Sequence, residues 1–266
     1  MRNLFFLWML PLFGWATNPY QQTGYVEICD VHREALSFDS LYVHFDEFIE
    51  FLQGNPVWAQ KLYAAKERFI RSKDKQLYST DFFGFYDESK QRGQIAFYYS
   101  THFHAFINSH FPELGRAPAI ARFFDACLEI QKPAIPLFEE AAQTLEVTTK
   151  FCILLKVVKY FPSYVATRPH YDGSAFSLFL HSTDNESLLL APYKSSFTTN
   201  DFSPSPRKQN SALLIPGALL AEFSILPTPH IVLQSGSTRF ATIAFAMRPN
   251  YIPPQVTYPP LPNFAH

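Results

Sequence analysis

From Lys150 to the C-terminus, the chain is a succession of short apolar runs separated by turn-forming residues such as Pro216-Gly217 and Ser235-Gly236. Short runs of this kind, bounded by turn signals, are typical of strands that pair with their neighbours. The runs are KFCILLKVVKYF, AFSLFLHS, SLLLAPY, SALLIPGALLAEFS, HIVLQS and TRFATIAFAM. We therefore expect residues 150–266 to form an all-β sandwich or barrel of the jelly-roll type, also called a double-stranded β-helix.

The residues before this point have a helical pattern instead. Apolar residues recur at helical spacing from Phe45 to Leu52 and stop at Gly54-Asn55-Pro56, after which a second helix is expected from Val57 to Ile70. Residues 117–147 predict a long helix, which Pro133 and Pro136 should kink or split.

Two strands are expected among these helices, at residues 24–31 and 93–101. Helices followed by a run of strands indicate the α+β class. We expect residues 17–149 to be a helix-rich region that forms one compact unit with the jelly roll.

The composition of the chain argues against several classes of protein and site. Aromatic and charged residues each make up 17% of the 266 residues, which excludes a disordered chain. A net charge of −1 without a basic stripe argues against electrostatic binding of nucleic acid. The three cysteines, at positions 29, 127 and 152, form no C-x-x-C motif, so a thiolate zinc site is unsupported. Their odd number argues against a disulfide framework, although one disulfide with a spare thiol stays open.

The N-terminus has the three parts of a secretory signal peptide. Arg2 precedes an apolar run from Leu4 to Trp15, and small residues Gly14 and Ala16 stand where a cut after Ala16 needs them. The run is too short to span a membrane as a helix of the mature chain. We expect residues 1–16 to direct export to the periplasm or the outside of the cell. The alternative is a cytoplasmic protein with an apolar N-terminal helix packed on its domain.

A histidine and a carboxylate stand two residues apart in the strand-rich half. In YFPSYVATRPHYDGSAFSLFL, residues 160–180, His170 and Asp172 follow a proline, and residues i and i+2 of an extended segment point to one side. Further along, Pro229-His230 opens one strand-like run and Arg239 opens another. Two imidazoles and one carboxylate on one face of an octahedral ion form the facial triad of non-haem Fe(II) oxygenases. Arg239 has the planar donor set that binds a carboxylate bidentately.

The order His-x-Asp, then His, then Arg resembles that of the 2-oxoglutarate/Fe(II)-dependent dioxygenases, specifically the isopenicillin-N-synthase-like group. The likeness covers roughly residues 150–250, including the segments KYFPSYVATRPHYDGSAFSLFL and LLIPGALLAEFSILPTPHIVLQSGSTRFATIAFAM. The resemblance implies that His170, Asp172 and His230 hold Fe(II) and that Arg239 holds the distal carboxylate of 2-oxoglutarate. It also implies that dioxygen and the 2-oxoacid together oxidise a C–H bond of a small molecule.

The sequence departs from this family at two positions. The family usually has a serine two places after the arginine, where this chain has Ala241, and a tyrosine before the upstream proline, where it has Phe161 beside Tyr160. Both family residues donate hydroxyls to the co-substrate. Each donor that is lost without replacement costs about 1.5–3 kcal/mol. The iron ligands are therefore retained, whereas the contacts to 2-oxoglutarate are reduced.

Other readings stay open. His170, Asp172 and His230 could be inert polar groups at strand ends, and Arg239 could pair with a structural carboxylate such as Glu222. The second His-x-Asp, His44 and Asp46, is expected to be structural, with Asp46 at the entry of a helix.

A third pair, His102 and His104, would share one face of a strand, but no carboxylate partner is evident nearby. The alternative function is a catalytically inactive, exported binding protein built on the same fold.

Overall fold

The computed structural model describes residues 20, 23–29, 37–147, 150–162, 168–184, 187–205, 211–233, 236–248 and 257–264. The signal-peptide prediction for residues 1–16 therefore lies outside the described residues. The helices are α2 (Phe38–Gly54), α3 (Pro56–Ile70), α4 (Ser89–Arg92), α5 (Thr101–His110), α6 (Pro112–Arg116) and α7 (Pro118–Thr144), with short 3-10 helices η2 (Asp74–Leu77), η3 (Thr199–Asp201) and η4 (Ala218–Phe223). The strands are β1 (Val26–Cys29), β2 (Gly84–Glu88), β3 (Gln94–Tyr99), β4 (Cys152–Tyr160), β5 (Phe176–Ser182), β6 (Leu188–Leu190), β7 (Ser203–Pro204), β8 (Ser211–Pro216), β9 (His230–Val232) and β10 (Arg239–Met247).

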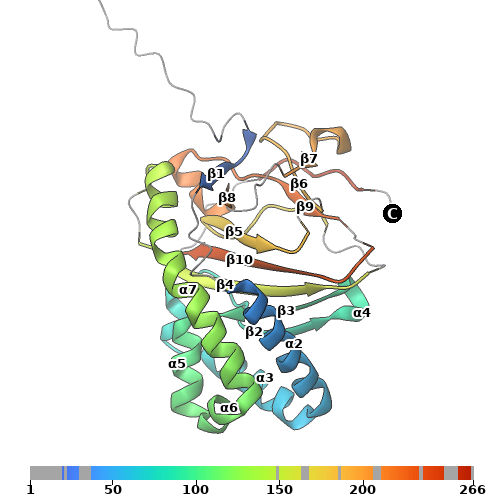
Figure 1. Cartoon of the computed structure of the whole chain (residues 1–266). Helices are drawn as coiled ribbons and strands as arrows, with labels where there is room; N and C mark the ends of the chain where they lie inside the picture. Colours follow the sequence, from blue (N-terminus) through green and yellow to red (C-terminus); the bar gives the residue numbers. More distant parts are fainter. Residues whose placement is uncertain are drawn as a thin grey trace, which may run out of the picture.

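The strands form two antiparallel sheets. The large sheet has the order β1-β8-β5-β10-β4-β3-β2, and the small sheet has the order β7-β6-β9. Figure 1 shows the small sheet to one side of β5 and β8. Most of the helices lie near β2, β3 and β4, whereas α7 runs along the large sheet up to the level of β1. The expected α+β class and jelly roll are confirmed, and the early strands β1 and β3 extend the large sheet.

Alternation along the strands of the large sheet separates two apolar layers. One layer lies between the two sheets, where Phe179, Leu213 and Ile243 pack against Leu188 and Leu190 of the small sheet. The opposite face packs on the helices, in a cluster that includes Leu155, Val157, Ala244, Phe48 and Phe123. The interior of the jelly roll, between the two sheets, is therefore lined by different side chains from those that pack on the helices. The candidate site lies among these interior side chains.

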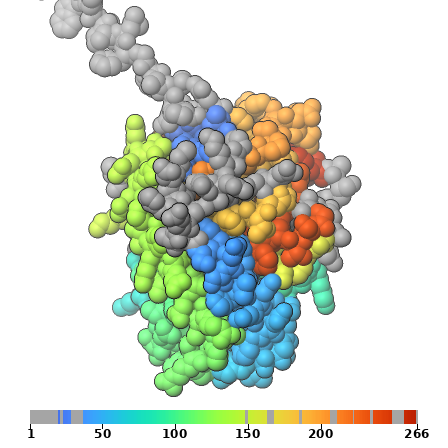
Figure 2. Space-filling model, viewed as in Figure 1, coloured from blue at the N-terminus to red at the C-terminus, as the bar shows by residue number. Residues whose placement is uncertain are grey.

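Helix α7 runs unbroken through both internal prolines, so the expectation that they would split it is wrong. Each proline removes one backbone hydrogen bond. The helix nevertheless buries an apolar stripe along its length, and on both sides of the prolines this stripe includes Ile130, Ala134, Leu137 and Phe138. Burial of that stripe offsets the lost hydrogen bonds. Figure 2 shows α7 and α2 side by side on the surface of the helical half.

Two local expectations for the helical half are corrected. Helix α2 begins at Phe38, so Asp46 lies in its middle and not at its entry. The Asp46 carboxylate accepts a hydrogen bond from Lys159 of β4 at 2.7 Å, which ties the helix to the sheet. His102 and His104 belong to helix α5 and not to a strand. None of the helices in the described part of the chain is both long and apolar enough to cross a membrane.

Candidate metal centre

His170 and His230 are joined through their backbones. The amide of His170 donates to the carbonyl of His230, and the amide of His230 donates to the carbonyl of His170, each at 3.0 Å. This bridge connects the segment after Pro169 to the start of β9. Their imidazole centroids lie 4.3 Å apart, so two histidines that are remote in sequence share one location.

Asp172 completes a cluster of three ligand atoms. Its Oδ1 lies 3.6 Å from Nε2 of His170 and 3.6 Å from Nε2 of His230. The three ligand atoms all lie within 4.8 Å of one another, which is a spacing that one metal ion can bridge. The structure thus brings the three predicted ligands to one point.

Both imidazoles are oriented by the backbone. Nδ1 of His170 lies 2.8 Å from the carbonyl oxygen of Arg168, and Nδ1 of His230 lies 3.2 Å from that of Thr228. Because a carbonyl only accepts, each Nδ1 carries a proton, which leaves Nε2 as the atom of each ring that can bind a metal. Such outer hydrogen bonds fix the tautomer and the ring angle of metal-binding histidines.

Asp172 is held as a carboxylate. Its side chain is 9% exposed, and Ser177 of β5 donates to Oδ2 at 2.5 Å. Burial alone would raise the pKa of Asp172. In the acid range where this carboxyl titrates, below the pKa of His230, the charge of protonated His230, the hydrogen bond and charge of His170 and the hydrogen bond from Ser177 together hold the pKa of Asp172 well below its usual value. One carboxylate oxygen is therefore engaged by the protein, and Oδ1 faces the two imidazoles.

His230 is held neutral. Its side chain is 2% exposed, and burial lowers its pKa to about 4 against the opposing charge of Asp172. A metal ion binds the neutral imidazole, so this histidine needs no deprotonation at neutral pH. The centre combines one anionic oxygen with unprotonated nitrogen, the donor set that suits Fe(II) and related divalent ions.

The cluster opens on one side into a cavity of about 870 Å³. His170, Asp172, Tyr98 and Lys156 are among its lining residues, and His170 is the most accessible of the three ligands, at 40% exposure. An ion held by the three ligands would therefore keep coordination positions that face the cavity, which is large enough for an organic molecule.

Gly217 lets the chain pass close behind Asp172. Its amide donates to Ala175 at 2.7 Å, and the next amide, of Ala218, donates to the carbonyl of Asp172 at 2.9 Å. A Cβ at position 217 would lie 2.2 Å from the carbonyl oxygen of Ser174. The turn predicted from Pro216-Gly217 therefore supports the loop that carries the ligand Asp172.

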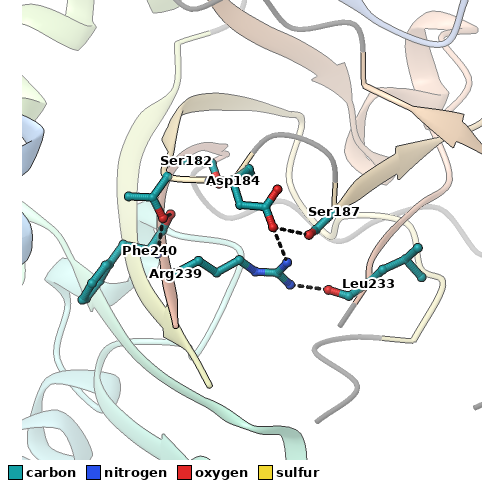
Figure 3. A network of polar contacts seen from close by, with 7 residues as sticks. Ser182, Asp184, Ser187, Leu233, Arg239 and Phe240 are labelled. Carbon is teal, nitrogen blue, oxygen red and sulfur yellow. Dashed lines mark hydrogen bonds and ion pairs between the residues drawn. The ribbon is translucent and has the colours of Figure 1, made fainter. Parts of the chain in front are cut away.

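Arg239 lies in a second, much smaller cavity of about 30 Å³ between the sheets. Its guanidinium is 3.1 Å from Oδ2 of Asp184 and donates to the carbonyl of Leu233 (Figure 3). It also lies over the ring of Tyr160, at 4.9 Å from the centroid. Ser187 donates to the same carboxylate oxygen of Asp184 at 2.6 Å. The partner of Arg239 is thus a structural carboxylate, as the alternative interpretation of the sequence allowed. That interpretation named Glu222 as an example, whereas the carboxylate found here is that of Asp184. Ala241 lines the same cavity, and Tyr160, not Phe161, reaches it.

The remaining histidine candidates have other partners. His44 lies 3.3 Å from Glu47 within α2, which agrees with the structural role expected for it. His102 and His104 contact the hydroxyls of Tyr78 and Tyr99, each at 2.9 Å. Each of these two histidines of α5 therefore has its own tyrosine partner.

Sequence reasoning missed Ser177 and Asp184. Ser177 is a lone hydroxyl inside the apolar run AFSLFL, and this isolation was its only signal. Asp184 stands in the turn segment HSTDNES, where an acidic residue is ordinary.

The chain matches no protein-family model and no curated protein. It is similar to solved structures, including dioxygenase for auxin oxidation 1 from Arabidopsis thaliana in a complex with 2-oxoglutarate (14% identity, TM-score 0.46, covering 76% of this chain and 81% of that one). A second is the dioxygenase for auxin oxidation of rice (13% identity, TM-score 0.45, covering 73% of this chain and 70% of that one). A third is a putative oxygenase from Shewanella oneidensis (13% identity, TM-score 0.41, covering 86% of this chain and 83% of that one). These values are too low to transfer an activity or a residue's role, so the assignment of this centre rests on its own geometry.

Proposed function

We propose that the protein is a mononuclear non-haem Fe(II) oxygenase or oxidase that acts on a C–H bond of a small molecule. The observation that carries this proposal is the convergence of His170, Asp172 and His230, of which His170 and Asp172 line a cavity of about 870 Å³. A facial set of two imidazoles and one carboxylate leaves room on the metal for dioxygen and an organic acid.

Each ligand has a defined part. His230 and His170 present their Nε2 atoms, Asp172 supplies the negative charge, and Ser177 and two backbone carbonyls hold these groups in place. Bound Fe(II) would supply the activation of dioxygen. The large cavity would position the substrate beside it.

The co-substrate we propose is 2-oxoglutarate. In this reaction one oxygen atom of dioxygen enters the substrate and the other enters succinate, which forms with carbon dioxide. The metal-binding end of the 2-oxoacid fits the open side of the centre. The distal carboxylate fits Arg239 less well, because in this structure the guanidinium already binds Asp184 and the Leu233 carbonyl.

The test is metal content measured by elemental analysis on protein purified without oxygen. We expect about one iron per chain in the wild type and almost none in His170→Ala, Asp172→Ala and His230→Ala. Asp125→Ala, on the exposed face of α7, is the matched control and should keep its iron. Unchanged iron in the three ligand variants would refute the ligand assignment. Succinate production from 2-oxoglutarate in the wild type tests the co-substrate separately.

A second candidate function is an inactive binding protein on the same fold. The observation that favours it is the Arg239–Asp184 ion pair, which occupies the arginine that the resemblance assigns to the co-substrate. Iron-free wild-type protein that still binds an organic ligand in the large cavity would support this function over the first.

We also propose that residues 1–16 are a signal peptide that is removed on export. Sequencing of the N-terminus of the mature protein tests this, with a first residue of Thr17 expected. A mature protein that retains its leader inside the cell would contradict export.

A further inference from the structure

Lys156 projects from β4 into the cavity that holds the metal ligands. The neighbours at every second position of β4, Val158 and Tyr160, belong to the apolar layer between the sheets, so Lys156 faces the same interior. Its strand partners are Tyr98 on β3 and Ile243 on β10. Lys156 and Tyr98 line the cavity together with His170 and Asp172.

A cation at this place is unexpected in a jelly-roll interior. Lys156 is only partly exposed, and among the described residues its ammonium has no ion pair. Its contact is with the ring face of Tyr98, at 5.6 Å from the centroid. Holding a charged amine there without an anionic partner costs free energy, which a bound anion would offset.

Lys156 shares its cavity with two of the metal ligands. Lys156, His170 and Asp172 all line the cavity of about 870 Å³. One small molecule in this cavity can therefore contact both the ammonium and a metal held by the three ligands.

The other cations near the centre are less suited to this task. Arg239 is bound by Asp184 in a cavity of about 30 Å³. Arg92, at the rim of the large cavity, lies 3.7 Å from Glu88, and Arg168 is exposed. Lys156 combines an interior position, a cavity of sufficient size and a charge that has no ion pair within the described part of the chain.

We propose that Lys156 binds the distal carboxylate of a dicarboxylic 2-oxoacid whose other end chelates the metal, and that Arg239 instead stabilises the fold through Asp184. This assignment rests on the proposed function and deepens it. It makes Lys156 the residue that sets the preference for a dicarboxylic over a monocarboxylic co-substrate.

The experiment compares two 2-oxoacids with the same five-carbon chain. 2-Oxoglutarate carries the distal carboxylate and 2-oxopentanoate lacks it. Each is titrated by calorimetry into full-length protein loaded with Mn(II), which binds the same kinds of ligand as Fe(II). The variants are Lys156→Met, Lys156→Arg and, as matched control, Lys159→Met. Lys159 is on the same strand but faces the helices, where it pairs with Asp46.

We expect the wild type to bind 2-oxoglutarate at least about tenfold more tightly than 2-oxopentanoate, as a charge-assisted contact requires. Lys156→Met should lose this preference through weaker binding of 2-oxoglutarate alone. Lys156→Arg and Lys159→Met should retain it.

If Lys156→Met still prefers 2-oxoglutarate over 2-oxopentanoate, the lysine assignment is overturned and Arg239 becomes the residue that binds the distal carboxylate. Mn(II)-loaded wild type with equal affinity for the two acids would also overturn it, while leaving the metal centre intact. Wild type that binds no Mn(II) would overturn the proposed function itself, and the lysine assignment with it.

Discussion

His170 and His230 are fixed to one another by two backbone hydrogen bonds of 3.0 Å, so the metal ligands are aligned by the sheet and not by side-chain packing alone. Asp172 then closes the set from the same loop as His170. A metal ion at this point would cross-link the loop to β9. Metal binding should therefore stabilise the folded state, because the unfolded chain cannot present the three ligands together.

The first prediction is this stabilisation. At a free Mn(II) concentration about 100-fold above its dissociation constant, the free energy of unfolding should rise by about 2.7 kcal/mol. Asp172→Asn should show almost no rise, because it loses the anionic ligand. Asp125→Asn, an exposed carboxylate on α7, should behave like the wild type. Calorimetric melting with and without Mn(II) measures the difference. Equal stabilisation of Asp172→Asn would show that the ion binds elsewhere.

The second prediction concerns Gly217. A methyl group there would lie 2.2 Å from the Ser174 carbonyl oxygen, so the loop carrying Asp172 has to move. We expect Gly217→Ala to lower the free energy of unfolding by about 1–3 kcal/mol and to weaken Mn(II) binding.

Gly173→Ala is the matched control for this change. Gly173 is adjacent to Asp172, but a Cβ there meets no atom within 4 Å. Urea unfolding and Mn(II) titration of both variants check the prediction. Similar behaviour of the two would mean that the close contact at Gly217 does not support the site.

The three ligands could be predicted from sequence because their order and spacing are local signals. His170 and Asp172 lie two residues apart on an extended segment, and such residues necessarily face one side. His230 could be placed with them only because the strand pattern predicted a closed β-fold. Backbone pairing then brings positions far apart in the chain together.

Other features depend on contacts that no local pattern encodes. The position expected for Asp46 was wrong because the helix begins earlier, at Phe38, where the N-cap residue Ser37 makes no side-chain capping hydrogen bond. His102 and His104 alternate as strand residues would, yet the serine cap at Ser100 starts a helix there. The partner of Arg239 is a turn residue, Asp184, brought close by the pairing of β10 with β5.

The third prediction is a pH dependence of stability in the metal-free protein. Burial lowers the pKa of His230 to about 4 from 6.5, so between these pH values the unfolded chain binds a proton that the folded chain does not. This contribution is fully present above pH 6.5 and is lost as the pH falls towards 4. The loss should approach about 1.4 kcal/mol per pH unit within the window.

His230→Gln provides the comparison, because it removes the titrating group. Asp172 titrates below this window, since its pKa is held down in the folded protein. Urea unfolding of both proteins in the presence of a chelator, from pH 7 to about pH 4.5, should show a shallower decline for the variant. Parallel declines would contradict the assignment of a buried neutral imidazole.

The fourth prediction tests the structural role of the Arg239–Asp184 ion pair. Arg239 is 3% exposed and Asp184 is 24% exposed, so removing the carboxylate leaves a buried guanidinium with the Leu233 carbonyl and the Tyr160 ring as its contacts. We expect Asp184→Ala to cost roughly 2–3 kcal/mol in the free energy of unfolding. Glu113→Ala breaks an exposed pair with Lys61 and should have no measurable effect.

The double variant Asp184→Ala/Arg239→Met distinguishes a structural pair from a ligand-binding arginine. Methionine fills part of the apolar cavity without a charge, so the double variant should recover stability relative to Asp184→Ala alone. We propose that Lys156 and not Arg239 binds the distal carboxylate of the co-substrate. The Mn(II)-loaded double variant should therefore also keep its preference for 2-oxoglutarate over 2-oxopentanoate. Chemical unfolding and calorimetric titration measure the two effects. If the double variant recovers stability and loses the preference, Arg239 binds the co-substrate as well as stabilising the fold.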